Sequence, residues 1–142
     1  MKLNHTKSAL VLAGVMVVSA FGAAQFKQIL KIVGVGAAVK QFGPDLNKGI
    51  NKLVKHSDTD KNFTKVVPIL SAGLASRQAI GAAQVKGPKA LVDKVQAVAQ
   101  IEQDLFGREV KIRAMVPVEK ADLTEIKAVE GVGVSGIVDL KL

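Results

Sequence analysis

The segment 131–136 reads GVGVSG, and its three glycines have the spacing of the dinucleotide-binding fingerprint G-x-G-x-x-G. In that fingerprint the glycine loop joins a strand to a helix, and the helix N-terminus holds the pyrophosphate. Only the six residues IVDLKL follow Gly136, so neither this helix nor the acidic residue expected about 20 positions later can be supplied. We therefore expect no nucleotide and no other cofactor here. The glycines are interpreted as places where a strand bends or where a neighbouring element approaches closely.

A second group of residues has the spacing of a metal site. Asp58, Asp60 and Asn62 match the first three ligands of a calcium-binding loop. A complete loop needs glycine at its sixth position and glutamate at its twelfth, where this chain has Phe63 and Ile69. We expect a polar loop that caps its neighbours and no metal site.

Histidine chemistry centres on His56, which ends a lysine-rich segment. A Ser-His-Asp arrangement with Ser71, Ser76 or Ser135 is compatible with the spacing, but no nucleophile-elbow motif accompanies these serines. The chain has no cysteine, which removes thiol nucleophiles, thiolate metal ligands and disulfides together. We predict a protein that is not an enzyme and keep a small secreted hydrolase as the second alternative.

The first 24 residues have the layout of a secretory signal peptide. Lys2 and Lys7 precede an uncharged apolar run, and small residues follow it. Cleavage after Ala24 or after Gly22 satisfies the small-residue rule, and we prefer the former; an uncleaved anchor is the alternative. We expect export to the periplasm or the exterior.

The charge of the chain is uneven. Its formal net charge is +8, and residues 25–65 contain eight lysines but only three aspartates. Lys48, Lys52 and Lys55 lie on the polar side of an amphipathic segment and are the candidate contacts for an anionic surface. The chain has no tryptophan or tyrosine and only five phenylalanines, so we expect no nucleic-acid partner that stacks bases on aromatic rings.

Several elements must position these residues, and their patterns predict the fold. Apolar spacings of three and four predict basic helices over 25–43 and 44–56, separated at Gly43-Pro44, and a longer amphipathic helix over 87–107. Alternating or β-branched patterns predict strands over 65–73, 76–87, 108–119 and 131–142. Pro68 favours an edge position for the first strand, because it cannot donate a ladder hydrogen bond.

These elements predict an α+β fold: an antiparallel sheet of about four strands (β-β-α-β-β) with one amphipathic helix on a face, preceded by one or two short helices. The expected organisation is a signal peptide (1–24), a basic helical segment (25–57), a polar loop (58–64) and an α+β domain (65–142). We predict an exported, non-enzymatic binding or structural protein of the cell envelope or exterior, whose partner is an envelope component or an anionic surface and which can form homo-oligomers. The first alternative is a peripheral membrane or polyanion-binding protein that uses the basic helices of residues 26–56.

Overall fold

The computed structural model describes residues 25, 27–28, 34–71, 79–120 and 126–140. The expected signal peptide 1–24 and the turn between the first two strands lie outside these residues. The described elements, in chain order, are α2 (Val35–Leu53), β1 (Phe63–Ser71), β2 (Ala79–Gly87), the single turn α3 (Lys89–Val92), β3 (Ala97–Leu105), the short 3₁₀ turn η2 (Phe106–Arg108), β4 (Val110–Val118) and β5 (Gly133–Val138).

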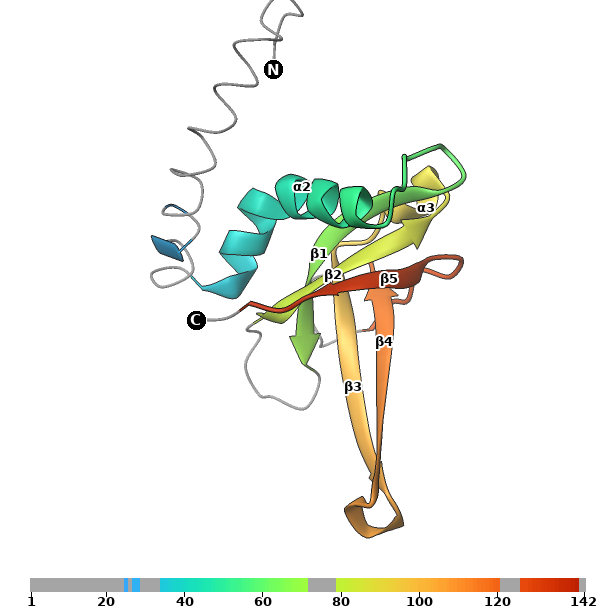
Figure 1. The fold of residues 1–142 in the computed structure, drawn as a ribbon. Helices are drawn as coiled ribbons and strands as arrows, with labels where there is room; N and C mark the ends of the chain where they lie inside the picture. Colours follow the sequence, from blue (N-terminus) through green and yellow to red (C-terminus); the bar gives the residue numbers. More distant parts are fainter. Residues whose placement is uncertain (1–24, 26, 29–33, 72–78, 121–125, 141–142) are drawn as a thin grey trace, which may run out of the picture.

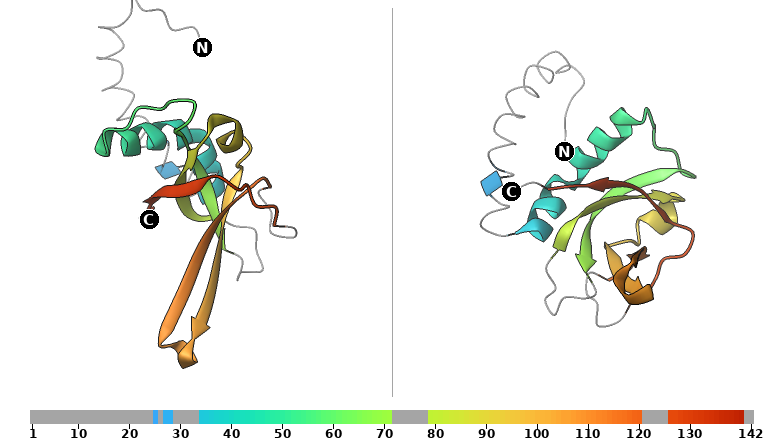
Figure 2. Two further views of the ribbon diagram at one scale, coloured as in Figure 1. Left: turned by 90° about the vertical axis from the view of Figure 1, so that its right-hand side faces the viewer. Right: turned by 60° about the horizontal axis from the view of Figure 1, so that its bottom comes forward.

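The five strands form one mixed sheet in the order β4-β3-β1-β2-β5. β1 runs parallel to β3, whereas the β1–β2, β2–β5 and β3–β4 pairs are antiparallel. The sheet curls into a half-barrel, and its two edge strands β4 and β5 come into contact (Figures 1 and 2). The expected antiparallel four-stranded sheet with several helices is therefore wrong.

The curl separates two apolar layers. Its inner side holds the main core, which is built largely from valines of four segments: Val67, Ile69, Ala83, Val85, Val92, Val95, Val98, Val129 and Val132. Its outer side is covered by α2, whose Val39 packs against Val66 and Ala82 while Leu46 and Ile50 extend the contact. This second layer fixes α2 on the sheet, with β1, β2 and β5 beneath it.

The largest correction concerns residues 87–107, which were expected to form one helix. The structure has one helical turn at Lys89–Val92 and then the nine-residue strand β3. The segment fits both periods, because Ala99 and Ile101 also alternate with the polar residues Gln100 and Glu102. β3 and β4 form nine residue pairs, and this pairing stabilises the strand over the helix. A local sequence pattern contains no information about such a long-range partner.

The expected break at Gly43-Pro44 is also wrong, because α2 continues through both residues as a single helix of 19 residues. Pro44 removes one backbone hydrogen bond and favours a kink, and the ribbon of α2 bends part-way along (Figure 1). Apolar residues on both sides of the bend, Val39 and Ile50 among them, pack on the same sheet. This packing stabilises a helix that local propensity would interrupt.

Candidate binding groove

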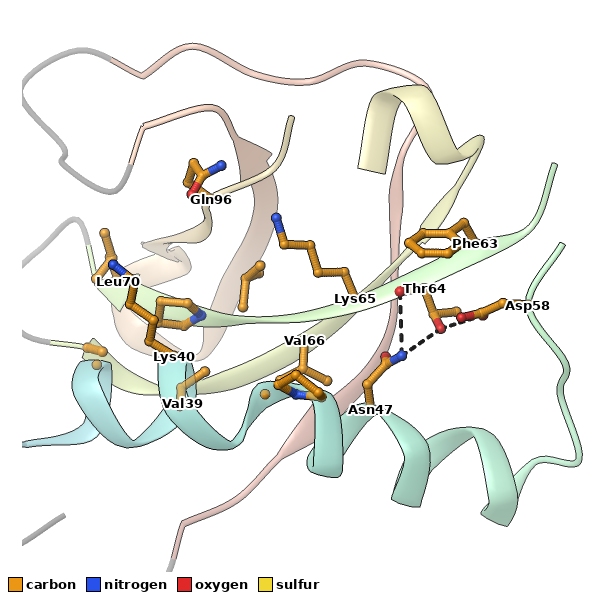
Figure 3. A pocket seen from close by; sticks show the side chains of 16 residues that line it. Val39, Lys40, Asn47, Asp58, Phe63, Thr64, Lys65, Val66, Leu70 and Gln96 are labelled. Carbon is orange, nitrogen blue, oxygen red and sulfur yellow. Dashed lines mark hydrogen bonds between the residues drawn. The ribbon is translucent and has the colours of Figure 1, made fainter. Parts of the chain in front are cut away.

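The candidate site lies along β1, at a place where the sheet is incomplete. β1 pairs with β2 along its length, but it pairs with β3 only from Ile69 to Ser71. Among the described residues, the β3-facing edge of residues 63–68 has no strand partner. A cavity of about 710 Å³ runs beside this stretch of six residues (Figure 3), within the volume range of ligand sites in proteins.

The backbone of β1 presents hydrogen-bonding groups to this cavity. The carbonyl oxygen of Thr64 lies 3.4 Å from Asn47 Nδ2 of α2, and that of Val66 lies 3.2 Å from the point where a Cβ of Gly43 would stand. Both carbonyls therefore lie on the side of β1 that faces α2 and the cavity. In an antiparallel ladder the N–H and C=O of one residue point to the same edge, so Thr64, Val66 and Pro68 face the groove. Pro68, which has no N–H to donate, occupies the open edge that its chemistry requires.

Two walls flank this edge. One wall is a single face of α2, whose residues recur at helical spacing: Gly36, Val39, Lys40, Gly43, Pro44 and Asn47. The other wall consists of Phe63, Lys65 and Gln96, which lie across β1 from α2 in Figure 3. Apolar side chains dominate the lining, and Gly43 lets the helix approach the carbonyl of Val66. We call this trough, bounded by α2, β1 and Gln96, the β1 groove.

Two lysines give the β1 groove a positive rim. Lys40 is exposed on α2, and Lys65 Nζ donates a hydrogen bond of 2.7 Å to the carbonyl oxygen of Val95. Burial lowers the pKa of Lys65, and the nearby Asp93 carboxylate partly opposes that shift by its charge. Among the described residues of the lining, Asp58 supplies the one acidic side chain.

A buried polar network closes the Asp58 end of the groove. Gln84 is 2 % exposed, and its Nε2 donates to Asn47 Oδ1 at 2.9 Å and to Asn51 Oδ1 at 2.8 Å. The hydroxyl of Ser135 donates to Gln84 Oε1 at 2.7 Å. Both asparagine amides donate to the hydroxyl oxygen of Thr64, which in turn donates to Asp58. Figure 3 shows the bonds that join Asn47, Thr64 and Asp58. The network joins α2, β1, β2 and β5, and it holds one wall of the groove in place.

Sequence reasoning did not single out this network. Asn47 and Asn51 lie four residues apart among the lysines of α2, and this spacing by itself indicates only a polar side of a helix. The available signal was Gln84, a long amide in a run of alanines and valines, because a buried amide needs partners from facing elements.

The residues considered for catalysis have other partners. His56 lies three residues after α2, and its Nε2 is 2.9 Å from the carbonyl oxygen of Asn62 and 3.2 Å from Asp58 Oδ1. Ser135 is bonded to Gln84, as described above, and Ser76 lies outside the described residues. The structure therefore pairs the histidine with an aspartate but gives Ser135 a different partner.

The residues of the calcium-like loop 58–62 form hydrogen bonds with other residues of the chain. Asp58 accepts the Thr64 hydroxyl at 2.6 Å, and the backbone carbonyl of Asp60 accepts the N–H of Lys89 at 2.8 Å. Asn62 donates its N–H to the Thr59 hydroxyl. Within residues 34–71, 79–120 and 126–140, no three acidic, histidine or cysteine side chains gather as a metal site would require.

The glycine triplet lies in and before β5, in agreement with the strand interpretation. Gly131 has a positive φ of 88°, as a turn into the strand requires, and a Cβ on Gly136 would touch Ile50 of α2 at 3.4 Å. The sheet register also shifts between Gln84 and Val85, opposite this strand. Both expected causes, a backbone bend and the close approach of a neighbour, are present.

The candidate surface residues Lys48, Lys52 and Lys55 are exposed at the C-terminal half of α2 and just beyond it. Leu53 beside them is 82 % exposed. In the part of the chain that is described, no helix has the length and hydropathy to cross a membrane. Comparison with family models, characterised proteins and solved structures finds no match to this chain, so its function must be argued from the β1 groove itself.

Proposed function

We propose that this protein is an exported, non-enzymatic binding protein that holds an extended polypeptide segment in the β1 groove. The segment adds as a strand to the open edge of residues 63–68 and receives main-chain hydrogen bonds from Thr64 and Val66. The observation that carries this proposal is an unpaired strand edge lying at the floor of a lined cavity of about 710 Å³.

The lining favours a segment with alternating character. Successive side chains of an added strand point to opposite faces of the sheet. One set meets the apolar wall formed by Val39, Pro44 and Val66, and the other set meets Lys65 and Gln96. A segment that alternates apolar residues with polar ones and carries an acidic end suits both walls, because the rim holds Lys40 and Lys65.

Binding can be tested with a blocked octapeptide of alternating threonine and valine that carries a glutamate at one end. Gly36→Leu places a side chain in the groove, where its Cβ meets only Ala79 Cβ at 3.8 Å. Gly49→Leu is the matched control, because that glycine lies on the exposed side of α2 with nothing within 4 Å. We expect saturable binding that Gly36→Leu weakens at least tenfold, about 1.4 kcal/mol, and that Gly49→Leu leaves unchanged. Equal binding by both variants refutes the groove as the site.

The export part of the proposal rests on residues 1–24 and has its own test. N-terminal sequencing of the protein recovered from its native cells should give Gln25 as the first residue, in a fraction outside the cytoplasm. An intact Met1 in the cytosolic fraction contradicts export and leaves the groove proposal standing.

The absence of catalysis is also a prediction. His56→Ala should leave every measured activity unchanged, because the imidazole is bonded to Asn62 and Asp58 at the end of α2. A folded His56→Ala protein that lost a defined turnover would instead favour the small secreted hydrolase.

One observation favours a second candidate function, contact with an anionic surface. Leu53 and Val54 are 82 % and 59 % exposed, and Lys48, Lys52 and Lys55 surround them. Exposed apolar residues among lysines suit the headgroup region of an anionic bilayer, where each lysine contributes about 1 kcal/mol. Sedimentation with anionic and neutral vesicles, at low and physiological salt, tests this candidate. Replacing all three lysines with glutamine should abolish salt-sensitive binding, and equal negligible binding in every arm eliminates the candidate.

A further inference from the structure

The feature that the β1 groove leaves unexplained is a two-stranded ribbon that projects from the sheet. The outer parts of β3 and β4, residues 100–115 with the η2 turn, extend away from the other strands and from α2 (Figures 1 and 2). We call this ribbon the arm. Pairing is continuous along it, from Gln100 opposite Met115 to Leu105 opposite Val110.

The arm has one apolar face and one charged face. Directly paired residues of an antiparallel ladder lie on the same face. The apolar face carries Ile101 opposite Ala114, Ile112 opposite Gln103, and Leu105 opposite Val110. The charged face holds Glu102, whose carboxylate accepts a 2.8 Å ion-pair hydrogen bond from Arg113.

The apolar face is uncovered among the described residues. Ile101, Val110 and Ile112 are 38 %, 41 % and 48 % exposed, and Phe106 at the tip is 78 % exposed. Along the arm, the outer edge of β4 has no strand partner among the described residues, because β4 ends the strand order and its bonds to residues 127–129 are confined to 117–119. An isolated two-stranded ribbon is marginally stable in water, so an arm of this length with a bare apolar face fits a partner that covers it.

We infer that the partner is the β1 groove of a second copy of this chain, so that the arm of one molecule adds to the open edge of the next. This inference rests on the proposed function, because it names the segment that the groove holds. Two lengths agree: the open edge of β1 spans six residues, 63–68, and the part of β4 that belongs to the arm spans residues 110–115, of which 110–114 are exposed. Each is about 20 Å long.

The side-chain chemistry also agrees. β4 alternates Val110, Ile112 and Ala114 with Lys111 and Arg113, the pattern that the two walls require. The ion pair to Glu102 and the pairing of Lys111 opposite Asp104 neutralise the cations within the arm itself. Glu109 precedes the strand at the arm tip and offers a carboxylate to the lysines of the rim.

A symmetric contact between two arms fits less well. If two β4 edges paired antiparallel about Ile112, Lys111 of each copy would lie opposite Arg113 of the other on one face. Like charges directly opposite one another destabilise a strand pair. The arm-to-groove contact joins two different surfaces, so it generates rings or open chains of molecules rather than a closed two-fold dimer.

Sedimentation velocity on four single variants of the purified chain tests this inference. Gly36→Leu blocks the groove and keeps the arm, whereas Ile112→Asp disables the arm and keeps the groove. Gly49→Leu and Ile137→Asp are the matched controls, the latter on the exposed face of β5. We expect the wild type and both controls to associate as concentration rises, and each test variant alone to stay monomeric.

Mixing the two test variants is the decisive measurement. Each has the surface that the other lacks, so an equimolar mixture should form a one-to-one dimer and nothing larger. A wild type that remains monomeric at the highest concentration, or a mixture that remains monomeric, overturns the inference. Circular dichroism checks folding, and Val110→Asp replaces Ile112→Asp if the latter unfolds. If the octapeptide still binds the groove while the wild type is monomeric, the proposed function stands and only the identity of the segment is refuted.

Discussion

The substitution Gln84→Leu tests whether the buried polar network holds α2 on the sheet. Leucine keeps most of the volume but removes two donated bonds, of 2.9 Å to Asn47 and 2.8 Å to Asn51, and one accepted from Ser135. A buried group that loses its partner costs about 1–3 kcal/mol. The two asparagines are half-buried and Ser135 is exposed to water, so we expect a total of about 2–3 kcal/mol.

For a domain of this size such a loss lowers Tm by roughly 8–15 °C. Chemical denaturation of the wild type and the variant, followed by circular dichroism, measures the difference directly. Gln100→Leu is the matched control, because that half-buried amide has only a 3.4 Å bond to the exposed Glu102, and we expect a change within about 0.5 kcal/mol. A Gln84→Leu loss as small as that of the control would refute the argument that these bonds position the groove wall.

Two further perturbations follow from the structure. Gly131→Ala should lower the free energy of unfolding by about 1–2 kcal/mol, because its φ is +88° and its Cβ would lie 2.8 Å from Leu91. Gly133→Ala is the control, and because it has open space around it, it should change stability by less than about 1 kcal/mol. Equal effects of the two substitutions in thermal unfolding would contradict the turn assignment. Because burial lowers the pKa of Lys65, the folded protein releases this proton at lower pH than the unfolded chain does, so stability should rise with pH across the alkaline range below 10.5. Lys65→Gln should flatten that rise relative to wild type in denaturation at several pH values, and parallel curves would show that the burial of Lys65 does not matter.

Strand patterns were the part of the fold that could be predicted from the sequence. The alternation of Val110, Ile112 and Ala114 identified β4, and the glycine-rich segment that contains Ser135 was correctly assigned to a strand. In these segments the local pattern and the long-range pairing favour the same structure. The edge position predicted for β1 from Pro68 is wrong, because β1 lies between β3 and β2, although its residues 63–68 have no strand partner on the β3 side among the described residues.

The rest of the fold depends on partners that a local pattern does not contain. The apolar residues of 87–107 fit a helical stripe and a strand face equally well, and only pairing with β4 decides between them. The parallel pairing of β3 with β1, which ends at Ile69 and so leaves the groove open, has no local signal at all. The groove could therefore not be found from the sequence, although Pro68 and Gln84 each marked one part of it.

Amide hydrogen exchange at β1 is the measurement that tests the central claim most directly. With the alternating octapeptide bound, the N–H groups of Thr64 and Val66 should exchange at least tenfold more slowly, because a strand added to the open edge accepts hydrogen bonds from them. Amides of β5, the opposite edge strand, should be unchanged and provide the internal control. Unchanged exchange at Thr64 and Val66 under saturating peptide, or equal slowing in β5, would contradict strand addition in the β1 groove.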